Sequence, residues 1–353
     1  MATIRDVARE SSVSIATVSR VFNKSPLVSD GTRERVMAAA ERLGYWPNGI
    51  ARSLITSRTH SIGVLLPELH GEFFSEVIHG IDLAARENGL HLLVSRATTT
   101  ADELASALRS LRGRVDALII MAPDLDTSAE LRLFAGQVPT VLLNSDAVID
   151  GCDRISVANV EGARAIVGHL IGLGHRRIAT ITGPAHNVDA RQRLEGYRAA
   201  LDEVGVAAAQ RIEVAGDFTE PSGYAATRAL LERRVRPTAV FVANDHMAIG
   251  VLSALQDAGV VVPRDLAVVG FDDIPMARYL TPPLTTVHVD LRRMGQRAMG
   301  LLLDRGPSGH GGGRCEVLDT TLVVRGTCGA QPPRNGETSH TWAGRRGSGG
   351  TRR

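Results

Sequence analysis

The chain has 353 residues, of which 44% are hydrophobic and 22% are charged, and its formal net charge is +2. This length has room for one small and one large domain, with enough apolar content for buried cores. No stretch approaches the about 18 consecutive apolar residues of a membrane-spanning helix. The N-terminal residues also have no apolar signal segment, so we expect a cytoplasmic protein.

Charge is distributed unevenly along the chain. Residues 1–60 hold nine basic and five acidic side chains, and residues 330–353 hold five and one. Because the total is +2, the residues between them carry −6. A basic head on an acidic body fits a protein whose head meets phosphate while its body does not.

The head has the pattern of a helix-turn-helix. Helical patterns at Ile4–Ser11 and Ser14–Phe22 are separated by only two residues, and a third helix is expected from about Asp30. Thr3 and Ser14 can cap the first two helices, because their hydroxyls accept the free N–H groups of a first turn. Such a module places one exposed helix face in a DNA major groove.

The second helix predicts which side chains meet DNA. When its valines face the core, the opposite side carries Ile15, Ala16, Ser19 and Arg20. Arg20 can pair with guanine through two acceptors, and Ile15 can contact a thymine methyl. Thr17 and Ser14 are better placed for phosphate, which positions the helix without reading sequence. The alternative for Arg20 is a solvated surface arginine.

A short hinge follows the third helix. Pro47 ends the preceding segment, and Asn48 can cap a new short helix. So short a helix is unstable alone in water, so we expect it to fold when docked. Leu54 then either enters a base step of the minor groove as a wedge or packs on the next domain.

Four head segments together carry a specific motif, namely Thr3–Ala8, Val13–Asn23, Val28–Glu34 and Gly44–Leu54. They resemble the lactose-repressor (LacI/GalR) family of bacterial regulators, and the match runs over about residues 2–327. The resemblance implies a homodimer on a pseudo-palindromic operator, with paired hinge helices in the central minor groove. The expected DNA-binding residues are Thr3, Ser14, Ile15, Ala16, Thr17, Ser19, Arg20, Asn23, Asn48, Ala51, Arg52 and Leu54. Ser12 stands where the family commonly has glycine, at a steric cost if the turn is left-handed.

From about residue 60 the chain alternates strands and helices. The expected strands are Ser61–Leu66, His91–Ser95, Asp116–Met121, Pro139–Leu143, Arg177–Thr182, Ile212–Val214, Thr238–Ala243 and Leu266–Gly270. The expected helices include Phe74–Asn88, Asp102–Arg112, Arg191–Val204 and Tyr224–Arg233. This is a doubly wound parallel α/β pattern delivered twice. Thr285–Val289 is expected to return to the first lobe.

The expected architecture is therefore a small all-α headpiece and a bilobed α/β effector domain, which by resemblance is similar to periplasmic sugar-binding proteins. The expected domains are a headpiece at 1–46, a hinge at 47–58, a body at 59–327 and a disordered basic tail at 328–353. The tail has no leucine heptad, which the tetrameric members of the family use, so the resemblance implies a dimer formed by the body.

Polar and aromatic residues gather after the strands, where ligands of such sheets bind. The expected effector-binding residues are Phe73, Phe74, Asn144, Arg191, Arg193, Phe218, Asn244 and Asp272. Rings can stack on the apolar face of a sugar while polar groups fix its hydroxyls. By resemblance, Arg193, Asn244 and Asp272 fall at effector-contacting positions. The alternatives are helix caps for Asp245 and Asp273, and a core role for Phe73.

We expect no catalytic residue, no metal and no cofactor. Cys152, Cys315 and Cys328 show no metal or disulfide spacing, and no glycine-rich phosphate loop follows a strand. A secreted solute-binding protein would lack the helix-turn-helix. The main hypothesis is a regulator controlled by a sugar. Two alternatives stay open, namely an effector-independent DNA-binding dimer and a regulator that senses a nucleobase or nucleoside. By resemblance, repression is the expected mode of control.

Overall fold

The computed structural model describes residues 2–23, 25–46, 58–96, 101–121, 129–305 and 313–330. The chain divides into two compact units, Met1–His60 with Gly113–Asp116 and Ser61–Arg112 with Ala117–Arg353. The predicted hinge and most of the predicted tail lie outside the described residues. The division into four domains stays a prediction, except at the end of the body, where Cys328 extends it.

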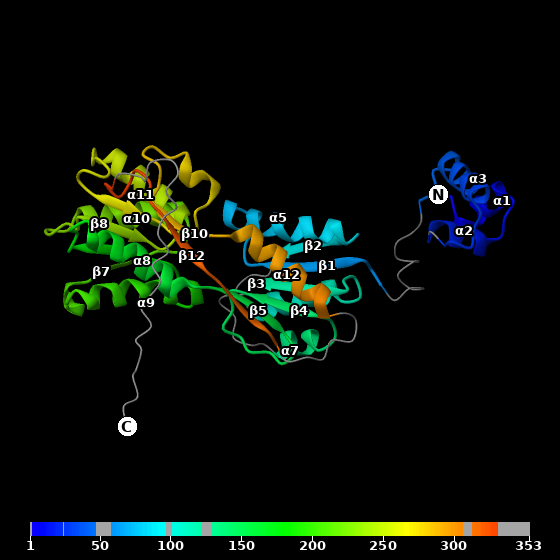
Figure 1. Cartoon of the computed structure of the whole chain (residues 1–353), viewed down its shortest axis with the longest axis horizontal. Helices are drawn as coiled ribbons and strands as arrows, with labels where there is room; N and C mark the ends of the chain where they lie inside the picture. Colours follow the sequence, from blue (N-terminus) through cyan, green and yellow to red (C-terminus); the bar gives the residue numbers. More distant parts are fainter. Residues whose placement is uncertain are drawn as a thin grey trace, which may run out of the picture. The chain divides into compact units, whose positions relative to one another are not determined.

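The first unit contains three helices (Figure 1), α1 (Ile4–Glu10), α2 (Ile15–Phe22) and α3 (Asp30–Arg42). The predicted pair Val18 and Val21 is buried with Val7 and Ala8, so the assignment of the core face is confirmed. Val36, Ala39 and Ala40 of α3 complete this small core.

The helix starts in this unit are fixed by side chains. The Ser14 hydroxyl accepts the Thr17 N–H at 3.1 Å, which confirms the predicted cap. Thr3 and Asp6 form a capping box, in which the Thr3 N–H and hydroxyl donate to the Asp6 carboxylate at 3.0 and 2.7 Å. Ser12 has a φ of 53°, so the turn between α1 and α2 is left-handed at a residue that is not glycine.

The first lobe of the second unit is built on a six-stranded parallel sheet in the order β11-β5-β4-β3-β1-β2. Its strands are β1 (Ser61–Leu66), β2 (His91–Arg96), β3 (Ala117–Met121), β4 (Thr140–Leu143), β5 (Asp153–Val157) and β11 (Cys315–Leu318). Its helices are α5 (Glu72–Glu87), α6 (Ala101–Leu111), α7 (Ala129–Ala135) and α12 (Leu291–Arg305). After Ser61, β1 is a buried apolar run, and β3 is buried and apolar throughout, as expected for a sheet covered on both faces.

The second lobe has a four-stranded parallel sheet in the order β7-β6-β8-β9. Its strands are β6 (Ile178–Thr182), β7 (Ile212–Ala215), β8 (Ala239–Val242) and β9 (Ala267–Val269). Its helices are α8 (Asn159–Gly172), α9 (Val188–Glu203), α10 (Glu220–Leu231) and α11 (Asp245–Asp257), with single 3-10 turns at Ala208–Gln210 and Pro275–Arg278. The two doubly wound parallel sheets confirm the predicted fold class.

The chain passes between the lobes three times, from β5 to α8, from β10 (Thr286–Val289) to α12, and from β11 to β12 (Thr320–Val323). The predicted late strand is β10, which pairs with β12 rather than with the sheet of the first lobe. The segments that return to the first lobe are instead α12, beside α5, and β11, beside β5.

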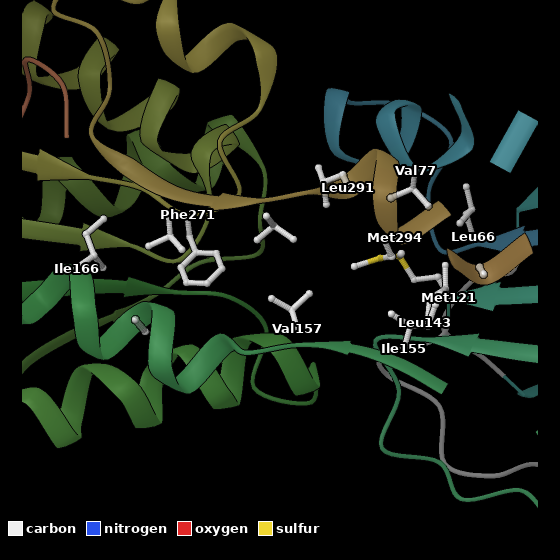
Figure 2. Close-up of a cluster of buried hydrophobic side chains, with 14 of the residues drawn as sticks. Leu66, Val77, Met121, Leu143, Ile155, Val157, Ile166, Phe271, Leu291 and Met294 are labelled. Carbon is white, nitrogen blue, oxygen red and sulfur yellow. The ribbon is translucent and has the colours of Figure 1, made fainter. Parts of the chain in front are cut away.

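One hydrophobic core runs through both lobes. Figure 2 shows Leu66, Val77 and Met121 of the first lobe in the same buried cluster as Ile166 and Phe271 of the second. Cys328, which the sequence assigned to the tail, is 2% exposed in this cluster. The body therefore extends beyond its predicted end, because a thiol with few polar demands fills a space in the core.

Glycines let paired helices cross closely. A Cβ on Gly196 of α9 would overlap the carbonyl oxygen of Val160 in α8. Likewise, a Cβ on Gly80 of α5 would overlap the Arg292 carbonyl of α12, and one on Gly250 of α11 would overlap the Glu220 carbonyl of α10. Each pair of helices can therefore pack this closely only because the residue at the crossing is glycine.

A buried ion cluster fastens the edge of the first sheet. Asp153 of β5 is 0% exposed and lies 2.6 Å from Arg305 at the end of α12 and 3.0 Å from Arg314 before β11. Burial alone would raise the pKa of Asp153, but hydrogen bonds from the two arginines lower it to about 2. The cluster therefore stabilises the ionised carboxylate.

Candidate functional site

The solvent face of α2 carries the predicted DNA-contacting side chains. Ser14, Ile15, Ala16, Arg20 and Asn23 are exposed or half-buried, and Ile15 keeps 45% of its surface although it is apolar. The exposed Ile15 can contact a thymine methyl, and the exposed Arg20 can donate to the edge of a guanine.

Several of the predicted DNA contacts are partly engaged within the unit. The half-buried Thr17 and Ser19 interact with neighbours on the same helix face, since the Ser14 and Thr17 hydroxyls lie 2.9 Å apart and the Asn23 amide donates to Ser19 at 3.4 Å. Thr3 is exposed at the start of α1. Asn48, Ala51, Arg52 and Leu54 lie outside the described residues, so the hinge contacts stay a prediction.

The second unit contains a cavity of about 320 Å³ between its two lobes. It opens where the parallel strands of both sheets end, which is where ligands of such sheets bind. The lining residues are Pro67, Glu68, His70, Gly71, Phe73, Phe74, Met121, Pro184, His186, Asn187, Asp189, Arg193, Asp217, Phe218, Thr219, Glu220, Asn244, His246 and Asp272.

Aromatic rings from both lobes line the cavity. Phe73 and Phe74, in the first turn of α5, meet edge to face with centroids 5.2 Å apart. Phe218 lies on the other lobe with a φ of 72°, and its ring fills the place of a side chain at Gly183. The Asn244 amide donates to the Phe218 carbonyl at 3.0 Å and so holds this unusual backbone.

Arg193 and Asp272 form a buried pair in the cavity wall, 3% and 2% exposed. The guanidinium lies 2.9 Å from Asp272 Oδ1, but this oxygen accepts no hydrogen bond of good geometry among the described residues. Burial raises the pKa of Asp272 to about 6, against the opposing effect of the Arg193 charge. The site therefore offers an acceptor with unused capacity.

Two further ionisable groups lie behind and beside this pair. Asp245 is fully buried, and burial followed by the charge of Asp272 raises its pKa well above the usual range. It accepts the Thr286 hydroxyl at 2.6 Å and the Ile274 N–H at 3.0 Å, which fits a structural role. Burial lowers the pKa of His246, so its ring is neutral near pH 7.

Several contacts join the lobes around the cavity. The Asn144 amide donates to Asp189 at 2.9 Å, and Arg191 pairs with Asp146 at 2.8 Å. Glu72 of α5 accepts the Met276 N–H of the second lobe at 2.7 Å. These contacts hold the lobes in the arrangement that encloses the cavity.

The structure brings six predicted effector residues to the cavity wall, namely Phe73, Phe74, Arg193, Phe218, Asn244 and Asp272. Asn144 and Arg191 do not line it and instead join the lobes. Ligand contact by all eight stays a prediction. Sequence reasoning missed His186, Glu220 and His246 as cavity residues, although His246 follows the Asn244-Asp245 strand end that pointed there.

In the described part of the chain no helix is long and apolar enough to span a membrane, and no group of three or more His, Cys, Asp or Glu side chains is placed to hold a metal. Family models match both units: residues 3–48 match the bacterial regulatory proteins of the lacI family, and residues 167–328 match the periplasmic binding protein-like domain. The ribose operon repressor of Escherichia coli (strain K12) is 39% identical over 307 residues, covering 86% of this chain and 93% of that protein. The chain belongs to the lacI family. It is thus a DNA-binding transcriptional regulator controlled by a small molecule, as predicted.

Solved structures of this family agree along the chain. The lac repressor dimer bound to operator and the anti-inducer ONPF has a TM-score of 0.82 at 34% identity, covering 93% of this chain and 99% of that one. The complex of the regulator CelR with cellobiose has a TM-score of 0.69 at 33% identity, with 93% and 100% covered. The lacI-family assignment therefore extends over head and body.

Proposed function

We propose that this protein is a cytoplasmic, non-catalytic transcriptional repressor whose affinity for operator DNA is set by a sugar bound between its lobes. A homodimer would place two α2 helices in successive major grooves of a pseudo-palindromic operator, in line with the operator-bound lac repressor dimer. The named relatives that act on ribose operons or bind cellobiose support a sugar as the effector class.

The observation that carries the proposal is the cavity between the lobes, with rings on its walls and a buried acceptor in its depth. Phe73, Phe74 and Phe218 offer flat apolar surfaces, and Asp272 Oδ1 is an acceptor with unused capacity. A sugar has apolar C–H faces and hydroxyl donors at its edge, so both features are matched in one ligand.

The mechanism follows from the three segments of chain that connect the lobes. A ligand that contacts Phe74 on one lobe and Phe218 on the other binds one lobe angle better than another. Such differential affinity is the only way a ligand shifts a conformational equilibrium. In a dimer, a changed lobe angle changes the spacing of the two chain segments that lead to the headpieces.

The decisive experiment selects an operator from a random DNA pool with the full-length protein and then measures its affinity with and without sugars. We expect a pseudo-palindromic site and at least one sugar that changes operator affinity by about 5- to 150-fold. Tight operator binding that responds to no compound would favour the effector-independent dimer. A response to a nucleobase instead of a sugar would favour the second ligand class.

A further inference from the structure

We infer that the cavity is built for an uncharged, polyhydroxylated ligand and discriminates against the phosphorylated and carboxylated forms of that ligand. This inference deepens the proposed function and rests on it. It concerns the chemical class of the effector, and it is carried by three independent observations on charge, on Arg193 and on the helix starts.

The charges that line the cavity are predominantly negative. Its wall contains five carboxylates and a single guanidinium, and it contains no lysine among the described residues. The carboxylates are those of Glu68, Asp189, Asp217, Glu220 and Asp272. With histidines counted as neutral, the wall has a formal excess of four negative charges. This excess repels an anionic ligand group when the group moves from water into the cavity.

The guanidinium in the wall is already committed to the protein. Arg193 donates from Nε to Asn159 at 2.9 Å and from Nη1 to the Ala243 carbonyl at 2.6 Å, and its Nη2 lies 2.9 Å from Asp272. The group also lies 3.9 Å from the ring centroid of Phe271. Phosphate and carboxylate are held by a fork of two parallel N–H donors, whereas all three guanidinium nitrogens of Arg193 already face protein acceptors.

Protein side chains also compete with an anion at the helix starts around the cavity. The N-terminus of a helix binds anions through its free N–H groups. Here the side chains of Asn187, Thr219 and Asn244, which all line the cavity, each accept one of the N–H groups of their own helix, at 3.1, 3.4 and 3.0 Å. The start of α5 carries Glu72, whose charge further disfavours an anion.

Two of these carboxylates already accept hydrogen bonds from the protein. Asp189 accepts two side-chain amides, from Asn144 and Asn159, and Asp217 accepts the Thr219 N–H and hydroxyl. Their charge is thereby shared with protein donors. The phenylalanine rings add apolar surface that suits the C–H face of a sugar ring. The rings and the hydrogen-bond acceptors of the wall together suit an uncharged polyol, and an amine is the competing ligand class that the test must include.

The test compares matched ligand pairs on the full-length protein by calorimetry and thermal unfolding. D-ribose and D-glucose are compared with ribose 5-phosphate and glucose 6-phosphate, with cellobiose as a larger neutral sugar and putrescine as an amine. We expect a neutral sugar to bind and its phosphate to bind at least about tenfold more weakly. Glu220→Gln removes one cavity charge and is expected to narrow this ratio. Glu232→Gln, an equal change at the exposed C-terminal end of the same helix, is expected to leave it unchanged.

Each outcome decides the inference. A phosphate that binds as tightly as its neutral parent, or putrescine as the tightest ligand, would overturn the inference and leave a sensing function intact. Binding of none of these compounds would overturn both. A neutral sugar that binds with the expected discrimination but leaves operator affinity unchanged would uphold the inference and refute the proposed function.

Discussion

Asn244 shows that one side chain can stabilise the fold and also line the candidate site. Asn244 caps α11 through the Met247 N–H, holds the backbone of Phe218 and also lines the cavity. The Arg20 side chain has no such second duty among its described contacts, and it lies exposed on α2. The two residues therefore call for different tests, because only a change at Asn244 would disturb the fold.

Arg20→Ala is expected to lower operator affinity mainly by losing discrimination at one base pair of each half-site, worth about 1–3 kcal/mol per site. The reason is that a guanidinium reads guanine through two acceptors at once. The measurement is anisotropy on the selected operator and on single-base variants of it. Arg35→Ala, on the exposed surface of α3, is the matched control and should leave discrimination unchanged. Equal weakening on all sequences by Arg20→Ala would assign it to phosphate instead.

The raised pKa of Asp272 makes the free energy of unfolding depend on pH. Its pKa is raised from 3.8 to about 6 in the folded protein. The folded state thus binds this proton more tightly, and the stabilisation is present below pH 3.8 and is lost as pH rises through about 6. Asp272→Asn should therefore gain stability relative to the parent protein as pH rises from about 4 to about 7, measured by urea unfolding. A constant difference across this range would contradict the assignment.

Asp153 supplies a control of opposite sign. Its pKa is lowered from 3.8 to about 2, so its stabilisation is present above pH 3.8 and is lost as pH falls towards 2. Asp153→Asn should lose stability at neutral pH and approach the parent protein only in acid. As pH rises, the two variants therefore diverge from the parent with opposite signs, since Asp272→Asn becomes relatively more stable and Asp153→Asn relatively less stable.

At the scale of elements, the helices show what sequence patterns reveal and what they leave hidden. The first two head helices and the strands β1, β2 and β6 lie within one or two residues of their predicted bounds, and α3 begins at the predicted Asp30, because apolar periodicity and capping residues are local signals. By contrast, β5, β11 and β12 were not among the expected strands. Their burial alternates or is partial, and β11 pairs with a strand about 160 residues away, which no local pattern encodes.

In the candidate site, too, some residues could be predicted from the sequence and others could not. Phe74, Phe218 and Asp272 follow strand ends, and a reader of the sequence can expect the carboxyl ends of parallel strands to converge. Arg191 also follows a strand end, but it lies about 200° around the axis of α9 from the cavity residue Arg193, and it faces Asp146 instead. The rotation of α9 is set by its packing on α8 through Gly196, and this is a tertiary property.

Glycines in helices give an element-scale prediction. Gly168 lies on the exposed side of α8 with nothing near its missing Cβ, whereas a Cβ on Gly196 would overlap the Val160 carbonyl. Gly168→Ala should stabilise the body by about 0.5–1 kcal/mol, because alanine loses less backbone entropy on folding. Gly196→Ala should destabilise it by about 1–3 kcal/mol, because the two helices must move apart. Urea unfolding of the two variants measures both, and equal effects would contradict the close crossing.

At the scale of the whole molecule, the lobe arrangement is held by contacts that differ from the ligand contacts. Asp146 and Arg191 pair across the lobes, and both are substantially exposed. An exposed ion pair contributes at most about 1 kcal/mol. It can still bias an equilibrium between two lobe angles whose energies are similar.

Asp146→Ala is expected to weaken effector binding by up to about fivefold, because it removes a contact that favours the enclosed cavity. Calorimetry with the sugar found in the panel measures this change. Arg198→Ala removes a comparable ion pair with Glu213 inside the second lobe and is the matched control. If both variants bind the sugar like the parent protein, the pair across the lobes has no influence on closure.

The three passages of the chain between the lobes also set an order of events during protein synthesis. The core of the headpiece is complete once Ala40 has been made, so this unit can fold early on the ribosome. The first sheet waits for β11 at residues 315–318, and β10 waits for its partner β12 at residues 320–323. Neither lobe is complete before nearly all of the body has been translated. The nascent body therefore exposes apolar strands throughout its synthesis, and premature termination just before β11 would yield two unfinished lobes rather than one finished one.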